Sequence, residues 1–166
     1  MATDNNLKEA FAGESQANRK YLAFAKQADA DKFPQVARLF RAASAAETVH
    51  AHAHLRVMGG IKGTADNVKA AIEGEVYEFQ KMYPQFLAQA EAEGNQGAII
   101  SFKHAMAVEA LHHQLYSEAL KALEGGKDMA PSSILVCPVC GNTVQNGVPD
   151  KCPVCGVAGS KFAEVV

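Results

Sequence analysis

Apolar residues in the first 124 positions are interspersed with Ala, Glu, Lys and Gln, in long stretches that hold few β-branched residues and few prolines. Because Ala, Glu, Lys, Gln and Leu are strong helix formers, the pattern predicts helices rather than strands. Short breaks separate four such stretches. The expected helices span residues 4–30, 34–58, 64–94 and 95–124.

Proline, glycine and threonine mark the expected limits of these helices. Pro34 suits a first helical turn, and Gly59-Gly60 ends the second helix. Thr64 is expected to cap the third helix. Pro84 lies inside the third helix, where its missing backbone N–H is expected to produce a kink.

The composition changes after residue 126. Residues 127–133 include Asp128 and Pro131 and indicate a linker into a tail rich in Cys, Pro, Gly and Val. We therefore expect an all-α four-helix bundle over residues 1–126 and a small knuckle domain over residues 134–166. The tail is too short to hold a core unless something such as a metal ion stabilises it.

Two of the predicted helices carry the same Glu-x-x-His motif, formed by Glu47 with His50 and by Glu109 with His112. Residues three apart share one helix face, so each pair can present a carboxylate oxygen and an imidazole nitrogen to one metal ion. A single such motif is weak evidence, because Glu is usually solvated and a lone His is more often packed or exposed. Two motifs are much harder to obtain by chance.

A further Glu precedes each motif at a matching interval. The interval from Glu14 to Glu47 is only one position shorter than that from Glu75 to Glu109, and Glu78 shares a helix with Glu75. The sequence thus predicts a duplicated helix hairpin. One Glu from each of two helices, with Glu-x-x-His from each of the other two, is the ligand set of a dinuclear carboxylate site. These oxygen-rich ligands suit iron or manganese better than structural zinc.

Tyr21 lies seven residues after Glu14, which is two turns along the same helix face. Its hydroxyl group can therefore donate a hydrogen bond to a ligand carboxylate. Packing in a hydrophobic core would explain Tyr21 equally well.

All four cysteines lie in the tail, in two Cys-Pro-Val-Cys-Gly motifs. Paired Cys-x-x-Cys motifs supply four thiolates in a tetrahedron, which is strong evidence for a metal site. A structural zinc ion and a redox-active iron ion both fit such a site. The four expected ligands are Cys137, Cys140, Cys152 and Cys155.

Charge and hydropathy exclude other classes of partner. The net charge of -2 and the pI near 6.3 provide no basic surface for nucleic acid or an anionic membrane. No apolar run is long enough for a transmembrane helix, and residues 1–7 are too polar for a secretory signal. The expected location is the cytoplasm, where thiols remain reduced and available to a metal ion.

Together these motifs resemble the rubrerythrin family, in which a ferritin-like bundle precedes a rubredoxin-like domain. The resemblance rests on Phe11-Ala-Gly-Glu14-Ser, Glu73-Gly-Glu75-Val-Tyr-Glu78, Met82-Tyr83-Pro84, the two Glu-x-x-His motifs and the doubled cysteine motif. It implies bridging roles for Glu47 and Glu109, and supporting roles for Tyr21 and Tyr83. The di-iron ligands that it implies are Glu14, Glu47, His50, Glu75, Glu78, Glu109 and His112.

The resemblance also implies an activity. A family member of this kind is a non-haem peroxidase that reduces hydrogen peroxide to water, and exchange of His50 for Glu78 on one iron is expected on oxidation. The four-cysteine iron would relay electrons from an external donor, either a rubredoxin or an NAD(P)H-dependent reductase. Two alternatives remain at this stage: a ferritin-like iron oxidase or iron store, and a non-catalytic electron carrier with a zinc-stabilised tail.

Two expectations concern assembly. The last helix continues about 12 residues beyond His112, or roughly 18 Å, so the tail is expected to start far from its own chain's ligands. A tail that folds back along the bundle is one solution, but a head-to-tail dimer, which the resemblance also implies, closes the gap more simply, so the tail is expected to serve a neighbouring subunit. Residues 59–63 reach only about 17 Å, whereas a helix of about 25 residues is roughly 38 Å long. A homodimer in which the two helix hairpins are domain-swapped would remove the need for a long crossover.

Overall fold

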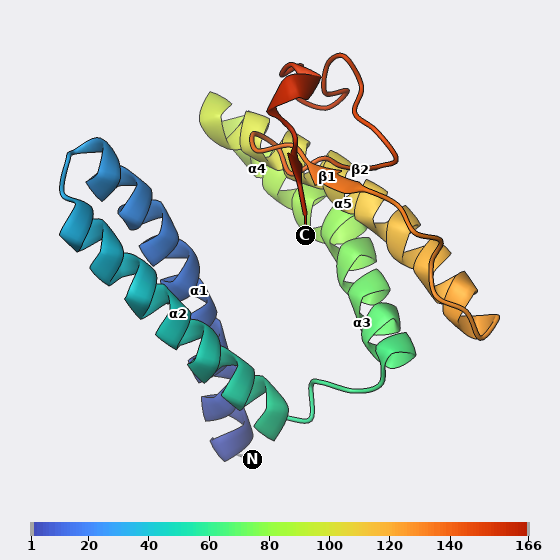
Figure 1. The fold of residues 1–166 in the computed structure, drawn as a ribbon, viewed down its shortest axis with the longest axis horizontal. Helices are drawn as coiled ribbons and strands as arrows, with labels where there is room; N and C mark the ends of the chain where they lie inside the picture. Colours follow the sequence, from blue (N-terminus) through green and yellow to red (C-terminus); the bar gives the residue numbers. More distant parts are fainter. Residues whose placement is uncertain (1, 166) are drawn as a thin grey trace. The chain divides into compact units, whose positions relative to one another are not determined.

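The computed structural model describes residues 2–165, so Met1 and Val166, the outer ends of the expected domains, lie outside the described residues. The chain divides into two compact units whose boundary lies between Lys62 and Gly63. The first unit is a pair of helices. The second unit combines helices with the small four-cysteine tail (Figure 1). The predicted fold class, a helical bundle followed by a cysteine knuckle, is confirmed.

The first unit is an antiparallel hairpin of α1 (Ala2–Ala30) and α2 (Pro34–Val57). Pro34 occupies the first turn of α2 as expected. Small side chains line the contact between the helices: Ala25, Ala37 and Ala51 are buried. Because alanine adds little bulk, the two helix backbones approach closely along this seam.

The helices of the second unit are α3 (Thr64–Tyr77), η1 (Glu78–Met82), α4 (Tyr83–Glu93) and α5 (Gln96–Glu124). Gly63, not Thr64, is the cap residue of α3, so the prediction that Thr64 caps this helix is wrong by one residue. Asn95 caps α5, where its side chain accepts a hydrogen bond from the backbone N–H of Ala98 at 3.1 Å.

The third predicted helix contains a turn of π-helix, η1, at the place where we expected a proline kink. The backbone N–H of Tyr83 donates to the carbonyl oxygen of Glu78, five residues earlier. In an α-helix, Pro84 would clash with the carbonyl of the residue four positions earlier and leave it unpaired. The wider π-turn accommodates the proline, so the helical run continues from Thr64 to Glu93.

The π-turn also accounts for a difference between the two halves of the sequence. The interval from Tyr21 to Tyr83 is one position longer than the interval from Glu14 to Glu75. One extra residue therefore lies between Glu75 and Tyr83, in the segment that contains η1. A π-turn takes up one inserted residue without rotating the rest of the helix, so the second half keeps the same faces as the first.

The tail is a small antiparallel sheet with strand order β2-β1-β3, formed by β1 (Ile134–Val136), β2 (Thr143–Gln145) and β3 (Ala163–Glu164). The linker that follows α5 reverses at Gly126, whose φ of 69° is in the left-handed region. The chain then runs back beside α5 to reach β1 (Figure 1). This reversal determines where the cysteines lie.

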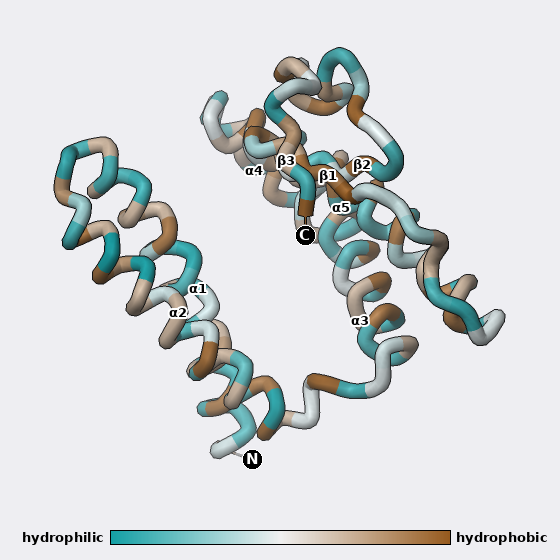
Figure 2. The backbone as a smooth tube through the Cα atoms, viewed as in Figure 1, coloured by the Kyte–Doolittle hydropathy of each residue, from teal (hydrophilic) through white to brown (hydrophobic). Residues whose placement is uncertain are grey.

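Apolar residues recur along the helices of both units (Figure 2). In the first unit, several large apolar side chains remain exposed, among them Leu39 at 68% and Val49 at 63%. Two helices have too little surface to cover these residues by themselves. None of the described helices has both the length and the apolar character needed to cross a lipid bilayer.

Candidate metal centres

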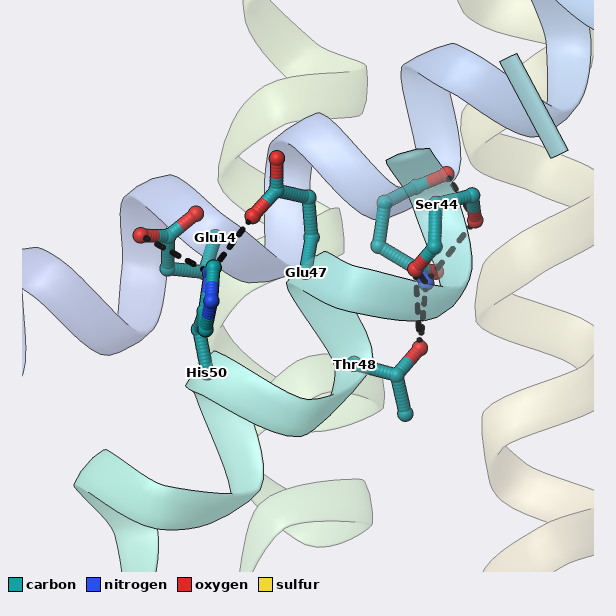
Figure 3. A network of polar contacts seen from close by, with 6 residues as sticks. Glu14, Ser44, Glu47, Thr48 and His50 are labelled. Atoms are coloured by element: carbon teal, nitrogen blue, oxygen red, sulfur yellow. Dashed lines mark hydrogen bonds and ion pairs between the residues drawn. The ribbon is translucent and has the colours of Figure 1, made fainter. Parts of the chain in front are cut away.

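The first candidate half-site lies in the α1–α2 hairpin, where Glu14, Glu47 and His50 converge (Figure 3). Glu14 comes from α1, and the other two residues come from α2. The Nδ1 atom of His50 lies 2.9 Å from Oε2 of Glu47 and 4.0 Å from Oε1 of Glu14. One ligand atom from each residue lies within 4.8 Å of the others, which is a spacing that one metal ion can bridge.

A buried polar network next to this half-site fixes how α1 and α2 pair (Figure 3). Asn18, one turn after Glu14, is only 9% exposed. Its Nδ2 atom lies 2.8 Å from the carbonyl oxygen of Ser44 and 2.6 Å from Oγ1 of Thr48. The hydroxyl group of Ser44 donates back to the carbonyl oxygen of Asn18 at 3.1 Å. These bonds allow one register of the hairpin, in which Glu14 faces Glu47.

The second candidate half-site repeats the first in the other unit. Glu75 of α3 faces Glu109 and His112 of α5, and one ligand atom from each lies within 4.8 Å of the others. The Nδ1 atom of His112 lies 2.9 Å from Oε2 of Glu109 and 3.8 Å from Oε1 of Glu75. This half-site is less exposed than the first, since the side chain of His112 is 28% exposed and that of His50 is 55% exposed.

The acidic groups of the second half-site destabilise one another as anions. Burial, followed by the nearby Glu109 carboxylate, raises the pKa of Glu75 from 4.5 to about 7. Burial and Glu109 also raise the pKa of Glu78, although His112 opposes this effect. A bound divalent cation would relieve both the desolvation and the repulsion, so the residues present fit a metal ion.

Glu78 and Tyr83 are linked by the π-turn. Glu78 is outside the three-residue group of Glu75, Glu109 and His112, but it begins η1 beside them. Burial, then the charges of Glu78, Glu109 and Glu75, raises the pKa of Tyr83. Five residues make about one turn of π-helix, so Tyr83 lies one turn after Glu78. In an α-helix, residues five apart lie on different faces, so the spacing in the sequence alone does not place Tyr83 beside Glu78.

Tyr21 occupies the matching position in the first unit. Its ring lies 6.1 Å from that of Phe40 and 6.3 Å from that of Phe24, measured between centroids. In the second unit, Tyr83 has the same relation to Phe102, at 6.1 Å, and to Phe86, at 6.4 Å. The aromatic packing anticipated for Tyr21 is therefore present, and its hydrogen bond to a carboxylate stays a prediction.

The four cysteines form the third candidate centre. The sulfur atoms of Cys137 and Cys155 are 3.6 Å apart, and those of Cys140 and Cys152 are 3.5 Å apart. A tetrahedron with metal–sulfur bonds of about 2.3 Å has sulfur atoms about 3.8 Å apart, so the group has the dimensions of a metal site. All four cysteines are free thiols rather than disulfides.

Backbone amides help to hold the thiolates. Burial alone would raise the pKa of Cys152, but hydrogen bonds from the backbone N–H groups of Cys155 and Val154 lower it to about 7. The knuckles turn at Gly141 and Gly156, with φ values of 83° and 76°. Glycine adopts this conformation without strain, which explains its place after each second cysteine.

The tail lies against its own chain's second half-site. The Nε2 atom of His112 is 3.0 Å from Oγ1 of Thr143 in β2, and Gly141 lies beside Val108 of α5. The expectation that the tail starts far from its own chain's metal ligands is therefore wrong. The helix length was correct, but the linker reverses and returns the chain along α5.

Neither the Asn18 network nor the contact of Thr143 was predicted from the sequence. Asn, Ser and Thr are unfavourable inside helices, so Asn18, Ser44 and Thr48 among alanines could have indicated a buried polar contact between the two helices. No comparable signal existed for Thr143. Its contact with His112 joins residues 31 positions apart in different elements, and depends on how the tail folds.

Comparison with known proteins finds relatives that match both the helical part and the cysteine tail. Residues 5–120 match the family model described as Rubrerythrin, and residues 136–163 match that of the rubrerythrin rubredoxin-like domain. The chain is 32% identical to Rubrerythrin-2 of Clostridium acetobutylicum, over 96% of this chain and 95% of that protein. It is 33% identical to nigerythrin of Nitratidesulfovibrio vulgaris, over 93% of this chain and 82% of that protein.

Solved structures give the same result. The chain is similar to a structure of nigerythrin in its mixed-valent state, with a TM-score of 0.58 and 32% identity, covering 98% of this chain and 86% of that one. A structure of fully reduced, all-ferrous nigerythrin gives a TM-score of 0.59 and 31% identity, with the same coverage.

Proposed function

Because the chain belongs to the rubrerythrin family, we propose that it is a peroxidase that reduces hydrogen peroxide to water at a di-iron carboxylate centre. Iron is its cofactor, and both the carboxylate ligands and the four-cysteine knuckle are present. The observation that carries the proposal is the repeated half-site, in which two carboxylates and one imidazole converge in each unit. Two such half-sites supply the ligand set of a dinuclear centre.

We assign one iron ion to each half-site. Glu14 and His50 would hold one ion, Glu75 and His112 the other, and Glu47 and Glu109 would bridge the pair, with Glu78 as a further ligand. When bound, the two ferrous ions supply the two electrons that, with two protons, convert one hydrogen peroxide molecule into two water molecules. The carboxylates would balance the charge of the ions and fix their positions.

Tyr83 is suited to hold a proton at this centre. Since burial and the neighbouring carboxylates raise its pKa, the phenol stays protonated at neutral pH and can donate a hydrogen bond to a ligand or substrate oxygen. The rings of Phe86 and Phe102 pack against its ring and help to hold it in place. We assign the same role to Tyr21 in the first unit.

The cysteine tail supports a relay of electrons rather than iron storage alone. A store of iron needs the carboxylates but gains nothing from a four-thiolate iron ion. In our proposal the four cysteines would hold an iron ion, which would supply one-electron transfer from the external donor to the di-iron centre. The external donor is a rubredoxin or an NAD(P)H-dependent reductase, and the active form is a homodimer.

Anaerobic reduction followed by addition of hydrogen peroxide tests the proposal. We expect about three iron ions per chain, one peroxide consumed per di-iron centre without a donor, and many turnovers with a rubredoxin and its reductase. Cys152→Ser should keep the single turnover and lose the repeated ones. An oxidised protein that deposits ferric iron but leaves peroxide intact would instead identify an iron oxidase.

Zinc in the tail with an empty bundle would contradict the proposal and favour the non-catalytic electron carrier or binding module. Metal analysis of protein reconstituted with iron alone distinguishes this outcome from replacement of iron by zinc during expression.

A further inference from the structure

The imidazole of His112 has contacts at both of its nitrogen atoms. Nδ1 faces Glu109 at 2.9 Å and Glu75 at 3.8 Å, on the side where we place the metal. Nε2 lies 3.0 Å from Oγ1 of Thr143, a residue of the cysteine tail. The contacts that the described residues make with His50 are at Nδ1, to Glu47 at 2.9 Å and to Glu14 at 4.0 Å. The two histidines thus differ in how firmly they are held.

The direction of the bond between His112 and Thr143 follows from the single proton on the threonine hydroxyl. The Thr143 hydroxyl donates this proton to the carbonyl oxygen of Gly141 at 3.1 Å, and that oxygen can only accept. Oγ1 therefore accepts the N–H of His112. An imidazole that donates through Nε2 presents the lone pair of Nδ1, which is the form that a metal ligand requires.

The cysteine knuckle holds Thr143 in this position. Thr143 pairs with Val136 in the sheet, and the residue before it accepts a hydrogen bond from the backbone N–H of Cys137 at 2.9 Å. Thr143 is thus attached directly to a segment that carries metal-binding cysteines. The tail is too small to remain folded without its metal ion.

We propose that Thr143 is a positioning residue for His112, and that the metal-loaded cysteine knuckle thereby raises the affinity of the second half-site for iron. The tail thus has a structural role at the carboxylate centre in addition to its relay of electrons. This inference rests on the proposed function only in taking His112 as a metal ligand.

Titration of ferrous iron into full-length protein tests the inference, with the tail iron retained and the bundle iron removed. Thr143→Val keeps the shape of the side chain but removes the acceptor, and we expect a dissociation constant about 10-fold to 100-fold higher. Thr143→Ser keeps the hydroxyl and should stay within about threefold of the wild type. Thr64→Val, which changes an exposed threonine at the start of α3, is the matched control and should have no effect.

The visible absorption of the ferric-thiolate tail reports whether each variant is folded. Unaltered affinity in a folded Thr143→Val protein would overturn the inference. Failure of the wild-type bundle to bind ferrous iron at all would instead count against the proposed function, so the two failures are distinguishable.

A second measurement does not depend on any variant. In zinc-loaded wild-type protein, the Nε2 proton of His112 should exchange slowly with water, because Thr143 accepts it, and can be followed by nitrogen-15 NMR. The exposed His50 supplies the internal reference. Exchange at His112 as fast as at His50 would show that no such bond is made, and would overturn the inference even if Thr143→Val did not fold.

Discussion

At the scale of single residues, the second half-site holds acidic side chains close together at an electrostatic cost. Glu75 and Glu109 are each 17% exposed at the side chain, and both meet the same histidine. Carboxylates so close together repel each other and lose hydration, and only a proton or a cation offsets that cost. Replacing Glu47 or Glu109, to which we assign a bridging role, and changing the pH are therefore the two direct tests.

Glu47→Ala and Glu109→Ala are each expected to lose nearly all bundle iron while the tail iron is kept. Both residues would bridge the two ions, so either change weakens both positions. Iron per chain should fall from about three to about one, with the ferric-thiolate absorption unchanged and peroxide reduction abolished. Glu73→Ala is the control, since Glu73 is exposed and outside the half-site. A full complement of iron in either bridge variant would refute the assignment.

The stability of protein without bundle metal should fall as the pH rises. The pKa of Glu75 is 4.5 in an unfolded chain and about 7 in the folded one, because of burial and then Glu109. Between these values the folded state binds more protons, so its free energy of unfolding decreases with pH, by about 1–3 kcal/mol in total.

Urea unfolding at pH 5 and pH 8, with the tail metal retained, measures this decrease. Glu75→Gln should remove most of it, and Glu73→Gln should leave it unchanged. An equal loss of stability in the Glu75→Gln protein would assign the effect to other groups.

At the scale of elements, η1 takes up the one residue by which the segment from Glu75 to Tyr83 is longer than the segment from Glu14 to Tyr21. Phe86 and Phe102 follow Phe24 and Phe40 by the same interval that separates Tyr83 from Tyr21. Only the interval that ends before the π-turn, from Glu14 to Glu75, is one position shorter. The aromatic clusters of the two units therefore match because the π-turn takes up the additional residue. The same turn lets Pro84 follow in α4 without a clash.

Deletion of a single residue tests this interpretation, in a Pro84→Leu background that removes the proline constraint. Deleting the exposed Gln80 should convert η1 to α-helix and keep both iron content and stability, within about 1 kcal/mol. Deleting Gln85, which is also exposed, should rotate Phe86 and Ala90 by about 100° away from α5, and cost several kcal/mol. Thermal unfolding of both proteins is the measurement. Equal losses would mean that η1 is not an insertion.

At the scale of the whole molecule, the connection between the two units limits how a bundle can form. Residues 58–63 separate α2 from α3, and six residues reach about 20 Å at most. The 24 residues of α2 are about 36 Å long. A ferritin-like bundle needs one long crossover along its length, which this segment is too short to provide. A homodimer in which the two chains exchange hairpins remains our prediction.

Co-expression of a Glu47→Ala chain with a Glu109→Ala chain tests domain swapping. In a swapped heterodimer, one centre receives both altered residues and the other receives neither, so about a quarter of the centres should regain iron and peroxide reduction after random pairing. In an unswapped protein every centre keeps one altered ligand. The two homodimers purified alone provide the baseline, and recovery no greater than that baseline would exclude the swap.

Most of the fold and the main candidate residues could be predicted from the sequence. Helix limits agree within two residues except around η1, because caps and helix formers act locally. The Glu-x-x-His motifs and the paired cysteines were recognisable for the same reason, since ligands three residues apart on a helix or within a knuckle are brought together by local geometry.

Other features depend on contacts between distant segments, and only the tertiary structure decided them. The π-turn brings Tyr83 to the carboxylates because an added residue and a proline must fit against α5. Asn18 meets Thr48 because two helices pack in one register. Thr143 meets His112 because the connection over residues 125–133 reverses and carries the tail back along α5. Local sequence limits each element's conformation, but these pairings depend on the packing of whole elements, which no single segment encodes.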